Sequence, residues 1–253
     1  MDILAAFAHP DDETRFLGGT LAMLASKGAR VHILIATRGE GGEVGEPPLC
    51  SQEELGEVRE KEMQCAADTL GASSLTFLDY SDPVVSDVGE VFAFDAELDT
   101  LASQILSAAH TVEARVIISH GSNGEYGHPA HKLVHQAVNH IRKMDHNMVL
   151  YSVSAIYDNH PKPRLANQDD PADFVLNIQP WYSSKLDATI CHHTQHALFV
   201  RRASKAAGRT MSLAEVTSDE ESLHRMWPTE KSDLDDPLAN FLRTTCVEAL
   251  REA

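Results

Sequence analysis

Two short stretches of the chain combine histidine with carboxylate side chains at a spacing that could hold a metal ion. The first reads His9-Pro10-Asp11-Asp12-Glu13, with three acidic residues in a row. Adjacent carboxylates repel one another, and a bound divalent cation relieves that repulsion. A simpler alternative is that an aspartate only caps the next helix and Glu13 complements its dipole, but this leaves His9 unexplained.

The second stretch runs from Gly124 to His131 and reads Gly-Glu-Tyr-Gly-His-Pro-Ala-His. His128 and His131 are three positions apart around an expected helix start, so their side chains can face the same way. With His9 and one acid of the first stretch, one of these histidines completes a set of two imidazoles and one carboxylate. Three protein ligands and an open position for water are typical of catalytic zinc.

The pattern of apolar residues places both stretches between a strand and a helix. Short apolar runs alternate with segments of helical spacing, which indicates right-handed βαβ units. The predicted fold class is α/β, an open and mostly parallel sheet with helices on both faces. Ligands bind beyond the carboxyl ends of strands in such sheets, where both stretches lie. We expect strands at residues 3–8, 31–37, 75–78, 116–120, 149–157 and 174–178, and helices at residues 14–27, 51–70, 94–109, 129–144, 181–197 and 237–250.

The last fifty residues carry a weaker pattern. Residues 204–235 are polar and are predicted to be irregular. Asp236-Pro237 then supplies an N-cap and a first-turn proline for the final helix. Residues 1–253 are interpreted as one domain, in which residues 204–253 form a C-terminal extension that could be a lid, an oligomer contact or simple packing. Three polar loops, at residues 43–52, 81–91 and 160–173, are expected to shape the substrate pocket.

Composition limits the classes of partner. The chain has 253 residues, 21 basic and 38 acidic, with a net charge of −17. Such a surface repels nucleic-acid backbones and anionic membranes, so neither is an expected partner. The N-terminus lacks the basic flank and long apolar run of a secretory signal. The four cysteines, at positions 50, 65, 191 and 246, form no C-x-x-C pair, and reduced thiols in a cytoplasmic protein are the simplest expectation.

Together the A-H-P-D-D-E run and the G-x-Y-G-H-P-x-H run resemble the PIG-L/LmbE-like family of N-deacetylases, and weaker similarity extends over roughly residues 1–200. The resemblance implies a Rossmann-like fold and a zinc-dependent hydrolase, with Fe²⁺ or Co²⁺ as possible alternatives. It implies removal of an acetyl group from a small N-acetylglucosamine-type amide, including precursors of mycothiol and bacillithiol, and a possible homo-oligomer. By motif position it gives His9, Asp12 and His131 as the metal ligands.

The same resemblance assigns roles to other positions. Asp11 matches the general base, and His128 matches the residue that stabilises the oxyanion or protonates the leaving amine. Tyr126 matches a tyrosine that contacts the reacting carbonyl. Sugar contacts are implied for Arg59, Asp82 and His192.

One position departs from the family pattern. The family commonly has H-P-D-H in the second stretch, and here Ala130 replaces the aspartate. Loss of a carboxylate that orients a ligand lowers metal affinity or activity by about 10–100-fold. The departure keeps two alternatives open, a thiol-conjugate amidase on the same fold and a metal- or sugar-binding protein with little turnover. An Ala130→Asp variant is expected to keep the fold. A nucleotide-dependent dehydrogenase and a serine hydrolase are discounted because G-x-G-x-x-G and G-x-S-x-G are missing.

Overall fold

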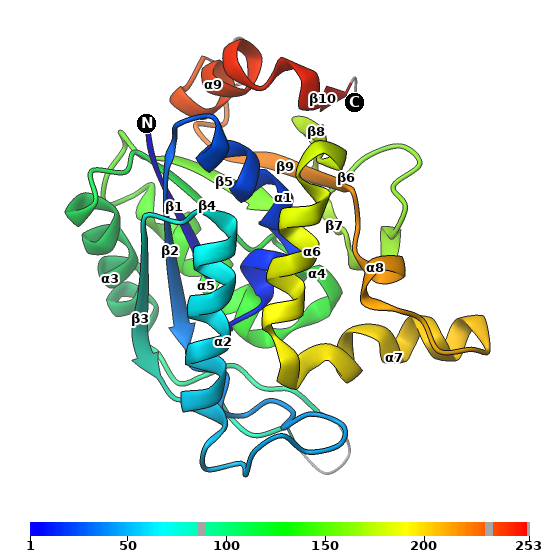
Figure 1. The fold of residues 1–253 in the computed structure, drawn as a ribbon. Coiled ribbons are helices and arrows are strands. Elements are labelled where there is room, and N and C mark those ends of the chain that lie inside the picture. The colour runs from blue at the N-terminus through cyan, green and yellow to red at the C-terminus, as the bar shows by residue number, and fades with distance from the viewer. Residues whose placement is uncertain (86–89, 231–234, 252–253) are drawn as a thin grey trace.

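The computed structural model describes residues 1–85, 90–230 and 235–251. Its main feature is an eight-stranded sheet with the order β10-β8-β9-β5-β4-β1-β2-β3 (Figure 1). A small two-stranded sheet pairs β6 (Ala155–Ile156) with β7 (Asn167–Pro171). The predicted α/β class with a mostly parallel, Rossmann-like sheet is confirmed.

The parallel part of the sheet comes from the first 153 residues, and all its strands lie close to the predicted ranges. The chain runs outward from β1 to β2 and β3, then returns to place β4 on the other side of β1. The strand order therefore reverses between β1 and β4, which is where open α/β sheets bind ligands. The parallel strands are β1 (Asp2–Phe7), β2 (Arg30–Thr37), β3 (Ser74–Tyr80), β4 (Val116–Ser119) and β5 (Val149–Val153).

The C-terminal part adds three antiparallel strands: β8 (Phe174–Asn177), β9 (Glu220–Trp227) and β10 (Leu250–Arg251). The expectation that residues 204–235 are irregular is wrong at residues 220–227, because β9 lies inside the sheet between β5 and β8, and residues 231–234 of that range lie outside the described part of the chain. The sequence hides this strand because its buried positions include charged residues. Glu221 pairs with Lys185 at 2.7 Å, and Arg225 pairs with Asp236 at 3.2 Å.

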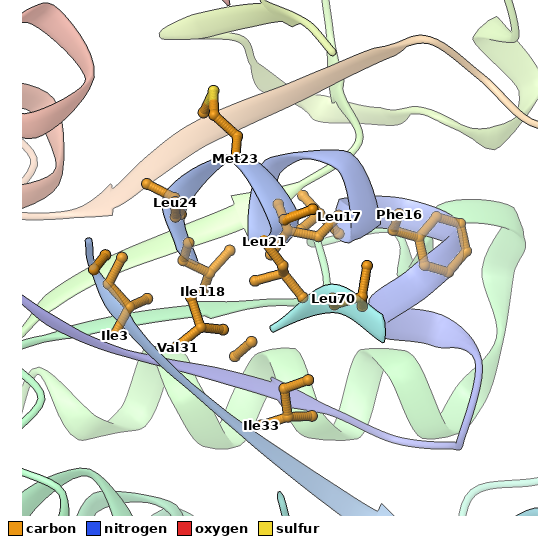
Figure 2. Packing of buried hydrophobic residues seen from close by; sticks show 14 of the residues in the cluster. Ile3, Phe16, Leu17, Leu21, Met23, Leu24, Val31, Ile33, Leu70 and Ile118 are labelled. Carbon is orange, nitrogen blue, oxygen red and sulfur yellow. The ribbon is translucent and has the colours of Figure 1, made fainter. Parts of the chain in front are cut away.

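Helices cover both faces of the sheet. One face carries α1 (Asp12–Ser26), α2 (Leu55–Leu70), α6 (Tyr182–Cys191) and α9 (Pro237–Thr245), and the other carries α3 (Leu98–Thr111) and α5 (Pro129–Ile141). Alternation along β1 explains the two cores, since Ile3 faces the first set of helices and Leu4 faces the second. Figure 2 shows Leu21 of α1 packed above Ile3, Val31 and Ile118 of the sheet.

Three shorter or more peripheral helices complete the chain: α4 (Gly124–Gly127), α7 (His196–Ala207) and α8 (Leu213–Val216). The helix expected over residues 181–197 ends at Cys191 instead, and α7 continues in a new direction (Figure 1). At the predicted N-cap of α9, the Asp236 carboxylate accepts hydrogen bonds from the amides of Leu238 and Ala239. No helix within the described ranges is long and apolar enough to cross a membrane.

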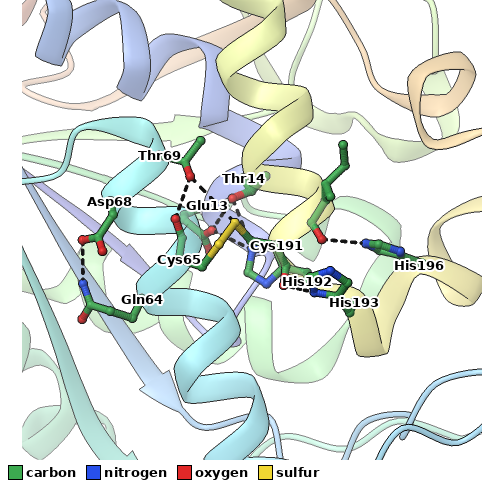
Figure 3. The surroundings of a disulfide bond; sticks show 11 residues. Glu13, Thr14, Gln64, Cys65, Asp68, Thr69, Cys191, His192, His193 and His196 are labelled. Carbon is green, nitrogen blue, oxygen red and sulfur yellow. Dashed lines mark hydrogen bonds and ion pairs between the residues drawn. A yellow bond between two sulfur atoms is a disulfide. The ribbon is translucent and has the colours of Figure 1, made fainter.

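A disulfide joins Cys65 of α2 to Cys191 at the end of α6, and Cys50 and Cys246 remain free (Figure 3). The expectation of four reduced cysteines is therefore wrong. The two cysteines are 126 positions apart in sequence. Spacing alone cannot reveal such a pair, because only the side-by-side packing of α2 and α6 brings the sulfur atoms together.

Candidate metal centre

The two histidine-carboxylate stretches meet at the carboxyl ends of the neighbouring strands β1 and β4. His9 lies in the loop after β1 and Asp12 begins α1, while His128 precedes α5 and His131 lies in its first turn, in the region after β4. The ring centroids of His9 and His131 are 5.4 Å apart, although the residues are 122 positions apart in sequence. The predicted convergence of the two loops is thus present in the structure.

Asp12 lies at the middle of this cluster. Its Oδ2 is 3.2 Å from His9 Nδ1, and its Oδ1 is 3.3 Å from His131 Nε2. Burial alone would raise the pKa of Asp12, but the neighbouring imidazoles of His131 and His120 outweigh it and hold the pKa well below its usual range. A permanently ionised carboxylate between two imidazoles is a suitable donor set for a divalent cation.

His131 gives the sharpest test of whether the residues fit a metal ion. Its Nδ1 lies 2.6 Å from Glu125 Oε2, and both side chains are fully buried. Its Nε2 points toward Asp12 and has no hydrogen-bond partner among the described residues. A buried imidazole held by a carboxylate through one nitrogen, with the other left unpartnered, is the usual arrangement of a zinc ligand. The residues present therefore fit the ion.

Two further histidines lie within reach of the same space. Candidate ligand atoms come together in two buried groups, His9 with His128 and His131, and Asp12 with His120 and His131. The Ala8 amide donates to His120 Nε2 at 3.0 Å, so that nitrogen's lone pair is already engaged. His120 is thus poorly placed to bind metal. The remaining candidate donors are His9, Asp12, His128 and His131, and the ligand set of His9, Asp12 and His131 stays a prediction.

Asp11 sits beside this set but faces a different partner. Its φ of 102° is left-handed, which is unusual for a residue other than glycine. The carboxylate accepts from Arg59 Nη2 at 3.0 Å, and the Asp11 amide donates to Glu13 at 3.1 Å. Burial raises the pKa of Asp11 to about 6, although Arg59 opposes the shift. Its side chain makes no helix-capping bond, so the capping alternative does not account for it.

His128, expected as an oxyanion or leaving-group residue, begins α5 as its N-cap. The amide of Ala130 donates to His128 Nδ1 at 3.2 Å, so Nδ1 holds a lone pair and Nε2 carries the proton. Burial, together with the charges of the neighbouring His9 and His131, lowers the pKa of His128 to about 3. This shift favours the neutral imidazole, whose Nε2–H stays available as a donor.

The structure places Tyr126 and Asp82 at the edge of the cluster. The Tyr126 ring is 5.4 Å from the His131 ring, and the tyrosine is 44% exposed. Asp82 Oδ1 lies 3.3 Å from His9 Nε2. Burial would raise the pKa of Asp82, but the hydrogen bond with His9 and its charge lower it. Both residues are close enough to the metal centre to meet a bound substrate.

The other two residues expected to contact sugar are buried. Arg59 is 3% exposed and donates to Gly39 O at 2.8 Å as well as to Asp11. A side chain at position 39 would collide with this guanidinium, since a Cβ there would be 2.2 Å from Nη1. His192 is fully buried, and its Nε2 lies 3.3 Å from Glu13 Oε1 (Figure 3). In this structure both residues support the Asp11–Glu13 segment, and their sugar contacts remain predictions.

Sequence reasoning gave no role to Glu125 or His120. Glu125 Oε2 accepts from His120 Nδ1 at 3.0 Å and from His131 Nδ1 at 2.6 Å, so one carboxylate oxygen orients two imidazoles. Burial would raise the pKa of Glu125, but the two histidines hold it well below its usual range. The backbone amide of Glu125 donates to the side-chain oxygen of Asn167, from a distant part of the chain, at 3.0 Å. For His120 the sequence did offer a signal, because the strand predicted at residues 116–120 ends there and ligands bind beyond the carboxyl ends of strands.

Glu125 also answers the question raised by Ala130. Ala130 is fully buried among apolar side chains, so the missing family aspartate leaves no gap beside the ligands. The carboxylate that orients His131 comes from Glu125, six residues before it. The support of His131 is therefore intact, although position 130 lacks a carboxylate.

The geometry agrees with a sequence match that covers more than half of the chain. Residues 4–142 match the model of the PIG-L family, described as GlcNAc-PI de-N-acetylase. The chain belongs to the PIG-L family. The matched segment includes all of the proposed ligands, the proposed base and the arginine beside it.

Curated relatives of this PIG-L chain are similar over part of their length. It is 35% identical over 147 residues to a 1D-myo-inositol 2-acetamido-2-deoxy-alpha-D-glucopyranoside deacetylase of Thermobifida fusca, covering 53% of this chain and 51% of the relative. It is 36% identical over 146 residues to the enzyme of the same name from Rhodococcus jostii, covering 53% and 50%. The match thus spans about half the length of these relatives.

Solved structures share the fold at lower identity. The zinc-inhibited teicoplanin deacetylase Orf2 matches with a TM-score of 0.61 and 16% identity, covering 90% of this chain and all of that one. N,N'-diacetylchitobiose deacetylase from Pyrococcus horikoshii matches with a TM-score of 0.58 and 16% identity, covering 93% and 88%. The 4-carboxy-2-hydroxymuconate hydratase GalB of Pseudomonas putida also matches, with 0.58, 20% identity and coverage of 92% and 99%. Because a hydratase shares it, the fold alone does not identify the reaction.

Proposed function

We propose that this protein is a metal-dependent hydrolase that removes the acetyl group from a small N-acetylglucosamine-type amide and releases acetate. The observation that carries the proposal is the unpartnered, buried Nε2 of His131, which faces Asp12 beside a second carboxylate, Asp11. The match to deacetylases of N-acetylglucosamine derivatives supports this substrate class.

His9, Asp12 and His131 are the residues that would hold the ion. Zinc is the proposed metal, and two imidazoles with one carboxylate would also accept Fe²⁺ or Co²⁺. Such an ion, when bound, polarises a carbonyl and lowers the pKa of a bound water from about 15.7 toward about 7. Glu125 fixes the ring of His131 through Nδ1, so that only Nε2 is offered to the ion.

Asp11 is the proposed general base. Arg59 holds its Oδ2, which leaves Oδ1 to accept the proton of an attacking water. The Arg59 guanidinium also donates to the carbonyl of Gly39, so it links the Asp11 turn to the loop after β2. A carboxyl whose pKa has moved toward neutrality can both take up and return a proton, as a base in attack and an acid in collapse require.

His128 is proposed to act as a neutral hydrogen-bond donor. With Nδ1 bound to the Ala130 amide, its Nε2–H is free to donate to the oxygen that becomes negative as the acetyl carbonyl is attacked. An unprotonated imidazole cannot supply the proton of the departing amine, so that proton is assigned to Asp11. The Tyr126 hydroxyl, on the exposed side, is proposed to contact the same carbonyl.

The test is an acetate-release assay on uncharged N-acetylglucosamine glycosides, with metal content measured on the same samples. Wild type loaded with zinc should release acetate, and metal-stripped protein should not. Asp11→Asn should keep its metal but lose about 10²–10⁴-fold in kcat, the usual contribution of a general base. Asp68→Asn, at an exposed position of α2, is the matched control and should match wild type. Metal loss in Asp11→Asn together with activity loss would move Asp11 into the ligand set and overturn the assigned roles.

The same assay addresses the two alternatives that remain. Turnover of a cysteine-conjugate amide, with none of the N-acetyl sugars, would favour the thiol-conjugate amidase. Stoichiometric metal without turnover of any amide would favour a binding protein.

The disulfide between Cys65 and Cys191 is a crosslink of a kind that is rare in reducing compartments, which is evidence against the expected cytoplasmic location.

A further inference from the structure

A cavity of about 90 Å³ lies next to the proposed metal centre, and basic side chains from distant parts of the chain line it. Arg15 comes from α1, Lys162 from the segment after β6, and Lys185 from α6. One water molecule needs roughly 10–15 Å³ of such space, so the cavity is large enough for a small polyatomic group. The predicted pocket loop at residues 160–173 contributes part of this wall.

The acidic residues of the cavity are already paired. Glu221 accepts from Lys185 at 2.7 Å, and its two oxygens also accept from the backbone amides of Gly19 and Thr20 at 2.9 and 2.7 Å. Glu220 accepts from the Tyr157 hydroxyl at 2.9 Å and forms an ion pair with Arg251. Neither carboxylate is left to neutralise a further cation.

Arg15 and Lys162 therefore bring positive charge that is not balanced inside the cavity. Within the described residues neither has a carboxylate within salt-bridge distance. The Arg15 guanidinium lies 4.8 Å from the Phe199 ring centroid. Lys162 Nζ donates to the carbonyl of Val216, and an ammonium has three donors, so two remain. Burial, with the nearby charges of Lys185 and Arg15, lowers the pKa of Lys162 to about 8.

This concentration of positive charge is contrary to the molecule as a whole, whose net charge is −17. Two partly buried cations with unused donors are costly unless something anionic joins them. His160 adds a further donor, since its Nδ1 accepts from the Lys162 amide at 3.0 Å and its Nε2 therefore carries the proton.

The cavity is separated from the metal centre by one side chain. The ring of Phe16 lines the cavity, and its centroid is 6.0 Å from that of His131. Arg15 comes three residues after the proposed ligand Asp12, and its charge reaches Asp11, where it opposes the rise in pKa. Arg15 and Phe16 thus place the cavity directly beside the proposed metal centre.

We propose that this cavity binds an anionic substituent, a phosphate or a carboxylate, carried by the substrate beyond its N-acetyl sugar. The inference rests on the proposed deacetylase function and narrows its substrate class to anionic N-acetylglucosamine derivatives. Lys162 and Arg15 are the specificity residues, and the charged hydrogen bonds they make hold the substituent while the amide is cleaved.

The test compares three substrates in the acetate-release assay: N-acetylglucosamine 1-phosphate, the carboxymethyl glycoside and the uncharged methyl glycoside. Wild type should prefer a charged substrate by about tenfold or more in kcat/KM, the scale of one hydrogen bond to a charged group. The charged substrate that is preferred distinguishes phosphate from carboxylate. Lys162→Gln should reduce the preference by about tenfold, and Lys205→Gln, an exposed cation on the adjacent α7, should retain it.

Binding provides a readout that does not depend on turnover. Inorganic phosphate and acetate should bind wild type in calorimetric titration, and Lys162→Gln should weaken that binding by about tenfold. If no amide is hydrolysed but Lys162-dependent anion binding persists, the deacetylase proposal fails and the anion site stands. If amides are hydrolysed without charge preference, and neither anion binds through Lys162, the anion site is overturned and the deacetylase proposal stands.

Discussion

The part of the chain that matches the PIG-L family and the part that does not differ in what they contribute. Residues 4–142 supply all the proposed ligands, the proposed base and Glu125. The rest supplies three antiparallel strands, one half of the disulfide and two of the three basic side chains in the cavity. Under the two proposals above, reaction chemistry would lie in the first part and substrate choice largely in the walls built by the second.

Removing a ligand from the first part should produce the largest effect. His131→Ala is expected to lose the bound metal, and with it all measurable turnover, because only two ligands remain. Metal analysis after dialysis checks this, and His140→Ala, further along α5, is the control that should retain metal. A purified His131→Ala protein that still carried one zinc per chain would contradict this assignment, because the metal ligands would then lie elsewhere.

A smaller effect is expected when a ligand is kept but its support is removed. Glu125→Gln keeps the size of the side chain but loses the charge that holds His131 and His120. Metal affinity should fall by about 10–100-fold, as for other residues that orient a metal ligand. Competition with a chelator measures this, with the exposed Glu57→Gln as control. Unchanged affinity in Glu125→Gln would mean that Glu125 only shapes the fold.

The disulfide joins the two parts of the chain, so removing it tests how much this link stabilises the protein. Cys65→Ser removes a crosslink that closes 126 positions of sequence, which should lower the free energy of unfolding by about 3–5 kcal/mol. A chain of this size then loses roughly 6–15 °C in Tm. Differential scanning calorimetry measures the change, and Cys50→Ser, a free thiol, should leave Tm in place. Equal Tm values for both variants and wild type would show that the bond does not form in solution.

The smallest effect on metal binding is expected at the position that departs from the family. Ala130→Asp should leave metal affinity nearly unchanged, well short of the roughly 10–100-fold change expected at Glu125, because His131 already has its carboxylate. Since Ala130 is fully buried among apolar groups, the new carboxylate should lower Tm unless it reaches His128. A tighter metal site in Ala130→Asp would show that Glu125 does not replace the missing aspartate.

Much of the parallel half could be predicted from the sequence because its signals are local. The strands at β1, β2 and β4 are short apolar runs, and the helix after His128 begins with proline and has helical spacing. Both histidine-carboxylate stretches also lie between a strand and a helix, so both are expected at the carboxyl edge of the sheet, whereas the pairing of β1 with β4 came only from the structure. These features depend on neighbours along the chain, which the sequence displays directly.

The remaining features depend on contacts between residues far apart in sequence. Residues 220–227 read as polar and irregular, yet they form β9 because Lys185 and Asp236 neutralise its buried charges. The Cys65–Cys191 bond has the same origin in the packing of α2 against α6.

The sequence by itself therefore determined the fold class, the family and the group of residues around the proposed metal, since short spacing and strand-helix order encode them. Only the tertiary structure decided that Glu125 supports His131, that Ala130 is buried among apolar side chains, and that Arg15 and Lys162 face one cavity. The physical reason is that hydrogen bonding, burial and charge balance are set by atoms brought together in space, and no periodicity in the chain records which distant side chains will meet.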